Sequence, residues 1–168
     1  MIAFRPLGGD DLPLLHDWLQ RPHVRRWWYD ASDTLAGTRA QYLPAIEGSD
    51  PTNPYFILVD EQAVGMIETY LVADHPEYAA LTGTGEGVAG VDVLIGEEEL
   101  TGRGLGTEVI RRFVHEIVFD RPEVHACIAT VEAANAASLR AFEKAGFGHI
   151  GDLVEDGRPS RLLRLDRL

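Results

Sequence analysis

The stretch from Gly90 to Thr107 reads GVDVLIGEEELTGRGLGT, and it constrains the fold of the chain more than any other segment. An apolar, β-branched run of strand length leads into a cluster of glycines, after which apolar residues recur at helical spacing. Glycines let the backbone approach a bound group closely, and the N–H groups at the start of a helix favour an anion. The stretch therefore predicts a strand, an anion-binding loop and a helix in succession.

Two well-known phosphate-binding motifs do not fit this loop. A P-loop needs a lysine directly after its last glycine, and the only lysine of the chain is Lys144. The dinucleotide fingerprint needs the spacing G-x-G-x-x-G, whereas Gly102, Gly104 and Gly106 give G-x-G-x-G. The loop is therefore neither the P-loop of a nucleoside triphosphatase nor the glycine motif of a dinucleotide-binding domain.

The rest of the chain alternates strand-like and helix-like patterns. Strands are expected at 2–7, in two runs within 55–72 joined by a turn at 60–62, and at 124–131, 147–154 and 159–168. Helices are expected at 11–20, 34–48, 105–118 and 135–146, and a long loop at 73–87. This order predicts one mixed sheet flanked by helices. A chain of 168 residues with 45% hydrophobic content is expected to form a single domain, 1–168.

The charge balance limits the possible partners. The chain has 27 acidic and 15 basic residues, a formal net charge of −12. Such a surface repels nucleic acid and anionic membranes, and it attracts cations over long distances. The sequence therefore predicts a cationic small molecule as partner.

Cysteine content and hydropathy indicate a protein of the cytoplasm. Cys127 is the single cysteine, so an intrachain disulfide is impossible, and its apolar strand predicts a packed side chain. The N-terminus lacks the apolar run of a signal peptide, and no segment has the length of a membrane span. No metal site is expected, and the chain is expected to be a monomer or a homodimer.

Two motifs give the chain a family resemblance. TGRGLG at Thr101–Gly106 resembles the Q/R-x-x-G-x-G/A loop of the GNAT superfamily of acyl-CoA-dependent N-acyltransferases. Asn135 followed by FEKAGF resembles the second conserved region of that superfamily. Thr101 departs from the usual Gln or Arg, which removes one side-chain contact and leaves the backbone of the loop unchanged. The resemblance extends over nearly the whole chain.

The resemblance implies an α/β (α+β) GNAT fold, with a central mixed, mostly antiparallel sheet flanked by helices, and acetyl-CoA as acyl donor. In that family the glycine loop binds the pyrophosphate, and backbone N–H groups of a splayed strand polarise the thioester. Phe142 stands where many members have a tyrosine, so no side-chain acid is expected for the leaving thiolate. The implied cofactor-binding residues are Val93, Leu94, Ile95, Thr101, Gly102, Arg103, Gly104, Leu105, Gly106, Thr107, Asn135, Ser138, Phe142 and Lys144.

Asp92 distinguishes two branches of the superfamily. The segment 11–28, the later PYF and GVD resemble the branch of aminoglycoside 6'-N-acetyltransferases, which carry Asp at this position. The hydroxylysine acyltransferases of siderophore synthesis share the WL-x-x-P-x-V and E-x-Y patterns but usually carry His there. A carboxylate suits an ammonium substrate, because it both binds the cation and accepts its proton. A non-catalytic acyl-CoA-binding module is a further alternative.

The aromatic and acidic residues outside the glycine loop complete the expected site. Two adjacent tryptophans cannot both enter one core from a regular element, so one of them is expected to line the substrate cleft. The run Glu97, Glu98 and Glu99 is expected to be solvated, since acids facing the loop would repel the cofactor. Asp92 is the expected catalytic residue, and the expected substrate-binding residues are Trp27, Trp28, Tyr55, Glu77, Tyr78, Glu86 and Asp92.

Overall fold

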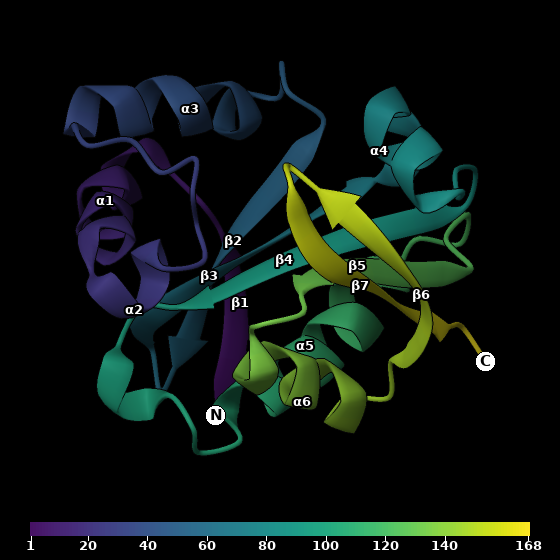
Figure 1. Cartoon of the computed structure of the whole chain (residues 1–168). Helices are drawn as coiled ribbons and strands as arrows, with labels where there is room; N and C mark the ends of the chain where they lie inside the picture. Colours follow the sequence, from purple (N-terminus) through teal and green to yellow (C-terminus); the bar gives the residue numbers. More distant parts are fainter. The chain divides into compact units, whose positions relative to one another are not determined.

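Seven strands form one sheet in the order β1-β2-β3-β4-β5-β7-β6 (Figure 1). The pairs β1–β2, β5–β7 and β6–β7 are antiparallel, whereas β4 and β5 run parallel. The computed structural model describes all residues from 1 to 168. The strands are β1 (Ile2–Pro6), β2 (Thr52–Val59), β3 (Gln62–Leu71), β4 (Val88–Ile95), β5 (Ala126–Glu132), β6 (Gly148–Glu155) and β7 (Arg158–Asp166). The mixed sheet expected from the sequence is confirmed.

Six α-helices connect the strands. They are α1 (Leu12–Gln20), α2 (Pro22–Arg25), α3 (Leu35–Glu47), α4 (Pro76–Thr82), α5 (Leu105–Phe113) and α6 (Ala136–Lys144). None of these helices combines the length and the apolar character that crossing a membrane requires.

Internal contacts divide the chain into two units. The first consists of Met1–Glu68 and Val93–Thr101, and the second of Thr69–Asp92 and Gly102–Leu168. The boundary crosses β3 and β4, so each of these strands contributes residues to both units.

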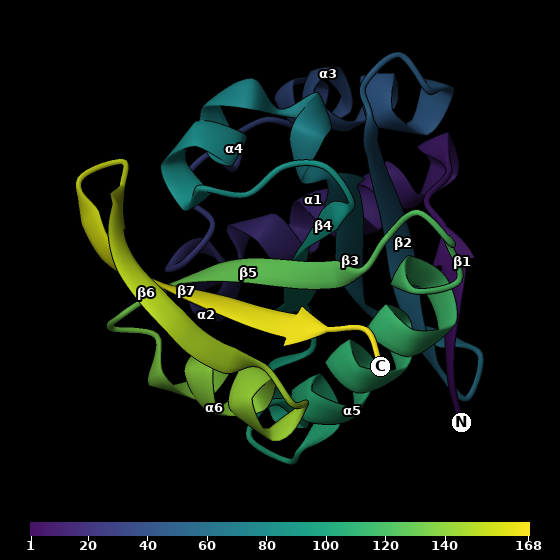
Figure 2. The same ribbon diagram turned by 90° about the vertical axis from the view of Figure 1, so that its right-hand side faces the viewer.

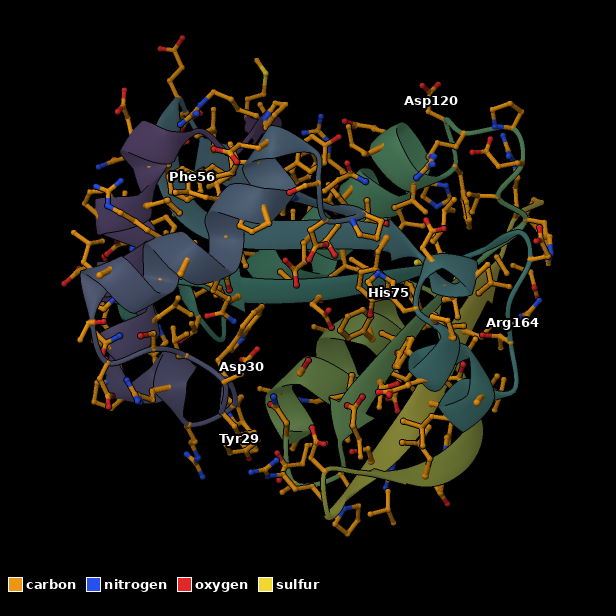
Figure 3. All side chains as sticks on the ribbon, turned by 90° about the horizontal axis from the view of Figure 1, so that it is seen from above. Tyr29, Asp30, Phe56, His75, Asp120 and Arg164 are labelled. Carbon is orange, nitrogen blue, oxygen red and sulfur yellow. The ribbon has the colours of Figure 1, made fainter.

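The core of the first unit forms around α1. Leu12, Leu15 and Leu19 recur at helical spacing and are fully buried, as the sequence predicts. Trp18 lies on the same buried face, and its ring packs against Phe56 of β2 with 5.0 Å between the centroids. Figure 3 labels Phe56 within this core.

In the second unit, β5 is covered on both faces. Figures 1 and 2 show α4 on one face and α5 with α6 on the other. The α4 face contains Ala126 and Ile128 of β5, which pack with Val88 of β4. Side chains of β-strands alternate between the two faces, so Cys127 points to the other face, where it is completely buried. The expected packing role of Cys127 is confirmed.

The helix after the glycine loop changes pitch along its length. α5 is a regular helix, and Val114–Val118 continues it as a π-helix in which Phe119 N–H donates to the Val114 carbonyl, at 2.8 Å. The wider turn keeps Phe113, Val114 and Val118 buried on one side of the helix. The apolar stripe of this segment is therefore confirmed, with a change of pitch that its spacing does not predict.

The expectation of a long loop at 73–87 is wrong over Pro76–Thr82, which forms α4. Pro76 occupies the first turn, where a missing N–H costs nothing, and Gly83 ends the helix in the left-handed region with φ +67°. Seven residues are too few for a helical period to stand out among Gly, Thr and acids. Pro76 and Gly83 are the only local signals of the helix, and they lie in a segment whose composition is typical of a loop.

Candidate active site

The parallel pairing of β4 with β5 ends early. It covers Val88–Gly90 and Ala126–Ile128, whereas the two strands continue to Ile95 and Glu132. Asp92 lies just past the last paired residue and is partly exposed. It shares a sheet face with Gly90, because the side-chain period of a strand is two. The geometry presents Asp92 where the two strands no longer pair with each other.

A cluster of hydroxyl-bearing side chains lies near Asp92. The Tyr78 hydroxyl of α4 forms a hydrogen bond with the Thr130 hydroxyl of β5, at 2.7 Å. The rings of Tyr70 and Tyr78 meet edge to face, with centroids 5.9 Å apart. The ring of His75, labelled in Figure 3, packs on Tyr70 in the same manner at 5.0 Å. This arrangement fixes α4 to the strand that follows the glycine loop and its helix.

The electrostatics of this cluster keep Tyr78 in its neutral form. Burial raises the pKa of the Tyr78 phenol well above its ordinary value, and the nearby charge of Asp92 raises it further. The pKa of the Cys127 thiol is raised by the same two causes, burial first. Tyr78 is therefore a neutral hydrogen-bonding group beside the Asp92 carboxylate throughout the physiological pH range.

Replacing Tyr78 by Phe is expected to lower the stability by about 1 kcal/mol at neutral pH, because Thr130 loses its partner. The difference narrows above about pH 10, where an unfolded tyrosine ionises. In the native wild type the raised pKa of Tyr78 prevents that ionisation, so Tyr78 contributes a loss of stability as the pH rises, and this contribution is absent from the variant.

Urea unfolding at pH 7 and at alkaline pH measures both effects. Tyr29→Phe is the matched control, because Tyr29 is exposed on the loop after α2 (Figure 3). A difference between wild type and Tyr78→Phe that stayed constant with pH would contradict the assigned environment of Tyr78.

The glycine loop has the backbone that its sequence predicts. Gly102 and Gly104 have φ of +71° and +83°, a region that side chains disfavour, and no atom lies within 4 Å of the position of an added Cβ at either residue. Gly104 is the N-cap of α5, whose first N–H groups have no acceptor within the helix. Gly106 meets Ala141 of α6, at 3.7 Å from the position of an added Cβ. An open glycine backbone and a helix N-terminus fit an anionic group such as a pyrophosphate.

The residues of α6 have structural surroundings of their own. Asn135 caps the helix, because its side-chain oxygen accepts from the Ser138 N–H at 3.2 Å. Phe142 is buried and packs edge to face on Phe147, with centroids 5.1 Å apart, and Lys144 is exposed. The Asn135 cap and the packing of Phe142 therefore fix the helix, and the Lys144 ammonium is accessible.

The structure places the remaining candidate residues in different surroundings. Trp28 packs against the core of the first unit, whereas Trp27 lies under the guanidinium of Arg26, at 5.0 Å. Tyr55 is partly buried on β2, opposite Pro6 of β1. Glu77 and Glu86 are exposed, on α4 and on the turn before β4. Trp28 therefore belongs to a core, and the lining of a substrate cleft by one of the two tryptophans stays a prediction.

Arg25 fixes the chain just before Trp27 and Trp28 through two hydrogen bonds. Its guanidinium donates to the Gln20 side chain at 2.7 Å and to Asp33 at 2.5 Å. These contacts join α1 to the end of the loop before α3. The sequence gives no signal for them, because the partners are brought together by the fold of the loop.

Around the end of β4, the expectation of a solvated acidic run is wrong for Glu97. Its carboxylate accepts from the indole N–H of Trp18 at 3.1 Å and from Arg21 at 3.0 Å, while Glu98 and Glu99 are exposed. Leu94 lies in the core of the first unit, so only its backbone is available to a ligand. Glu97 is separated from Trp18 by 79 positions, a distance over which the sequence carries no pairing signal.

Comparison with known proteins identifies the family. The model of the acetyltransferase (GNAT) domain matches residues 9–154. The chain is 30% identical over 161 residues to an aminoglycoside N(6')-acetyltransferase type 1 of Klebsiella pneumoniae, covering 95% of this chain and 80% of the relative. A relative from Serratia marcescens with the same description matches equally well.

Solved structures agree with this assignment. The crystal structure of aminoglycoside acetyltransferase AAC(6')-Ib in complex with coenzyme A has a TM-score of 0.85 and 29% identity, and covers 99% of this chain and 95% of that chain. A complex of the same enzyme with coenzyme A and kanamycin has a TM-score of 0.84, with the same identity and coverage. The chain belongs to the GNAT family of acetyltransferases.

Proposed function

We propose that this acetyltransferase moves the acetyl group of acetyl-CoA to the 6'-amino group of an aminoglycoside. The similarity to aminoglycoside N(6')-acetyltransferases carries the proposal, because it extends over 95% of the chain and includes the segment of Asp92. The family match spans residues of both units, which supports a single functional domain. All candidate residues are on one chain, so the proposal applies equally to a monomer and to a homodimer. A cytoplasmic location is part of the proposal, because acetyl-CoA is available in that compartment.

On the donor side, the residues present fit acetyl-CoA. The open backbone from Gly102 to Gly104 and the first N–H groups of α5, from Leu105 to Thr107, bind the pyrophosphate. Backbone N–H groups of β4 beyond Asp92 polarise the thioester carbonyl, as electrostatic stabilisation of acyl transfer requires. Thr101, Arg103, Asn135, Ser138 and Lys144 are the further proposed contacts of the donor.

On the acceptor side, Asp92 binds the ammonium group and removes its proton. An ammonium nitrogen has no lone pair, so it must be deprotonated before it attacks the thioester carbon. The overall charge of −12 raises the local concentration of a polycation. Trp27, Tyr55, Glu77, Tyr78 and Glu86 are proposed to contact the acceptor, and Trp28 to support Trp27 from the core.

The reaction is a direct transfer within a ternary complex. The ammonium proton passes to Asp92 directly or through water, and the amine nitrogen then forms a bond to the thioester carbon. The carbon–sulfur bond breaks, and the nitrogen releases its second proton to water. The buried Phe142 has no hydroxyl, so solvent protonates the leaving thiolate. Binding both substrates in one orientation supplies most of the rate enhancement.

A thiol-release assay tests the proposal. Purified protein is incubated with acetyl-CoA and kanamycin, tobramycin, a polyamine or hydroxylysine, and free thiol and acetylated product are measured. Thiol release that requires an aminoglycoside supports the proposal. Release with hydroxylysine alone would favour the siderophore branch, and tight binding of CoA without turnover of any amine would favour a non-catalytic module.

A further inference from the structure

The C-terminal end of β4 is bound by three side chains from α1, α2 and their junction. We call this end, residues 95–97, the β4 exit. The imidazole of His23 donates to the Ile95 carbonyl at 2.9 Å. Arg21 donates to the Gly96 carbonyl at 2.8 Å and to the Glu97 carboxylate at 3.0 Å. Three consecutive residues are therefore each bound by the same helical segment. We refer to Trp18, Arg21 and His23, with Ile95, Gly96 and Glu97, as the β4 clamp.

The opposite side of the same backbone is bound to β3. The Gly96 N–H donates to the Val64 carbonyl at 2.8 Å, and the Glu97 N–H to the same oxygen at 3.4 Å. In a trans peptide the C=O and the following N–H point in opposite directions, so the Ile95 carbonyl points away from Val64. The exit of the strand is thus held from both sides.

Gly96 and Glu97 match the buried Trp18 in shape and in polarity. A Cβ at Gly96 would lie 2.3–2.4 Å from atoms of the Trp18 indole, so only glycine lets the chain pass over the ring. The indole N–H donates to Glu97 at 3.1 Å, and with Arg21 it lowers the pKa of the Glu97 carboxyl. The carboxylate is therefore bound as an anion, and Arg21 balances its charge.

A short bonded turn connects the clamp to the glycine loop. The Leu100 N–H donates to the Glu97 carbonyl, and the Thr101 N–H to the Glu98 carbonyl, both at 3.0 Å. The Thr101 hydroxyl donates to the same Glu98 carbonyl at 2.6 Å. The orientation of the Glu97 backbone is thereby transmitted to Thr101, where the loop begins.

The clamp lies, along the chain, between the two segments that the proposed function assigns to acetyl-CoA. Val93 precedes the clamp and Ile95 is its first residue on β4. Thr101 and the glycines follow the clamp. We propose that Glu97, bound by Trp18 and Arg21, is a positioning residue for acetyl-CoA: it touches no substrate, and it fixes the β4 exit and the entry of the glycine loop in the geometry that binds the donor. This inference rests on the proposed function.

The test compares Glu97→Ala, Glu97→Gln and the control Glu99→Ala. Glu99 is an exposed residue of the same turn, so its substitution removes an equal charge without touching the clamp. Calorimetry measures binding of CoA itself, and steady-state kinetics give the KM of each substrate. For Glu97→Ala we expect about a tenfold weaker CoA affinity, from the ordering cost that the clamp otherwise removes. The KM of the acceptor and the kcat at saturating acetyl-CoA stay close to the wild-type values.

Glu97→Gln keeps an oxygen that accepts from the Trp18 N–H, so it is expected to recover most of the CoA affinity. For the same reason, we expect it to fold even if Glu97→Ala does not. The positioning role is refuted if both folded variants bind CoA like the wild type, or if the acceptor KM rises as much as that of acetyl-CoA. A wild type that binds no CoA would overturn the proposed function and this inference together. A wild type that binds CoA and Glu97 variants that bind it equally would overturn only the inference.

Discussion

Asp92→Asn is expected to lower kcat by a factor of about 10²–10⁴, the usual contribution of a general base. The amide has nearly the same shape as the carboxylate and cannot accept the proton of the amine. CoA affinity is expected to stay unchanged, because the glycine loop is intact. The deficit should shrink as the pH rises, since solvent then deprotonates a growing fraction of the amine.

Kinetics with acetyl-CoA and an aminoglycoside between neutral and alkaline pH measure this effect. Asp120→Asn is the matched control: it makes the same change of charge at an exposed turn (Figure 3) and reports any loss due to the overall field alone. An Asp92→Asn enzyme within about threefold of the wild type would remove Asp92 from the chemistry, because even weak general-base catalysis exceeds that factor.

Gly90→Ala is expected to reduce stability and activity together. The added Cβ would lie 2.3 Å from Cε2 of Tyr70 and 2.7 Å from its hydroxyl oxygen, so the ring has to move. Overpacking of this kind costs about 1–3 kcal/mol. In a chain of this size each kcal/mol lowers the melting temperature by about 2–4 °C.

The displaced ring is also the neighbour of Tyr78, and Gly90 is two residues before Asp92 on the same face. Misplacement of a reacting group by about 1 Å can cost a factor of about 10² in rate, so the activity of the folded variant is expected to fall by that order. Gly85→Ala is the control, because its Cβ would meet no atom within 4 Å. Thermal unfolding and kcat that match those of Gly85→Ala would show that Tyr70 adapts without consequence.

Elements with a strong local pattern were predictable from the sequence. Leu12, Leu15 and Leu19 mark the buried face of α1, and the turn at Asp60 and Glu61 joins β2 to β3 with both residues at positive φ. The glycine loop was predictable as well, because Gly102 and Gly104 need a backbone that other residues disfavour. In each of these cases a few neighbouring residues determine the local conformation.

Features that depend on distant partners were not predictable. Glu97 looks like part of a solvated run until the fold brings Trp18 and Arg21 to it. The hydrogen bond between Tyr78 and Thr130 joins positions 52 residues apart, and it needs the α4 helix that the sequence pattern did not reveal. Composition describes the residues of a segment and says nothing of the side chains that pack against it.

The early end of the β4–β5 pairing has a consequence for solubility. Strand backbone that stops pairing with its neighbour invites a strand from another molecule, and charged side chains pointing inward are one way in which proteins discourage such association. Asp92 lies two residues beyond Gly90, the last residue of β4 that pairs with β5. The carboxylate that is proposed to accept a proton is also of the kind that discourages strand addition, so a substitution of Asp92 bears on association as well as on catalysis.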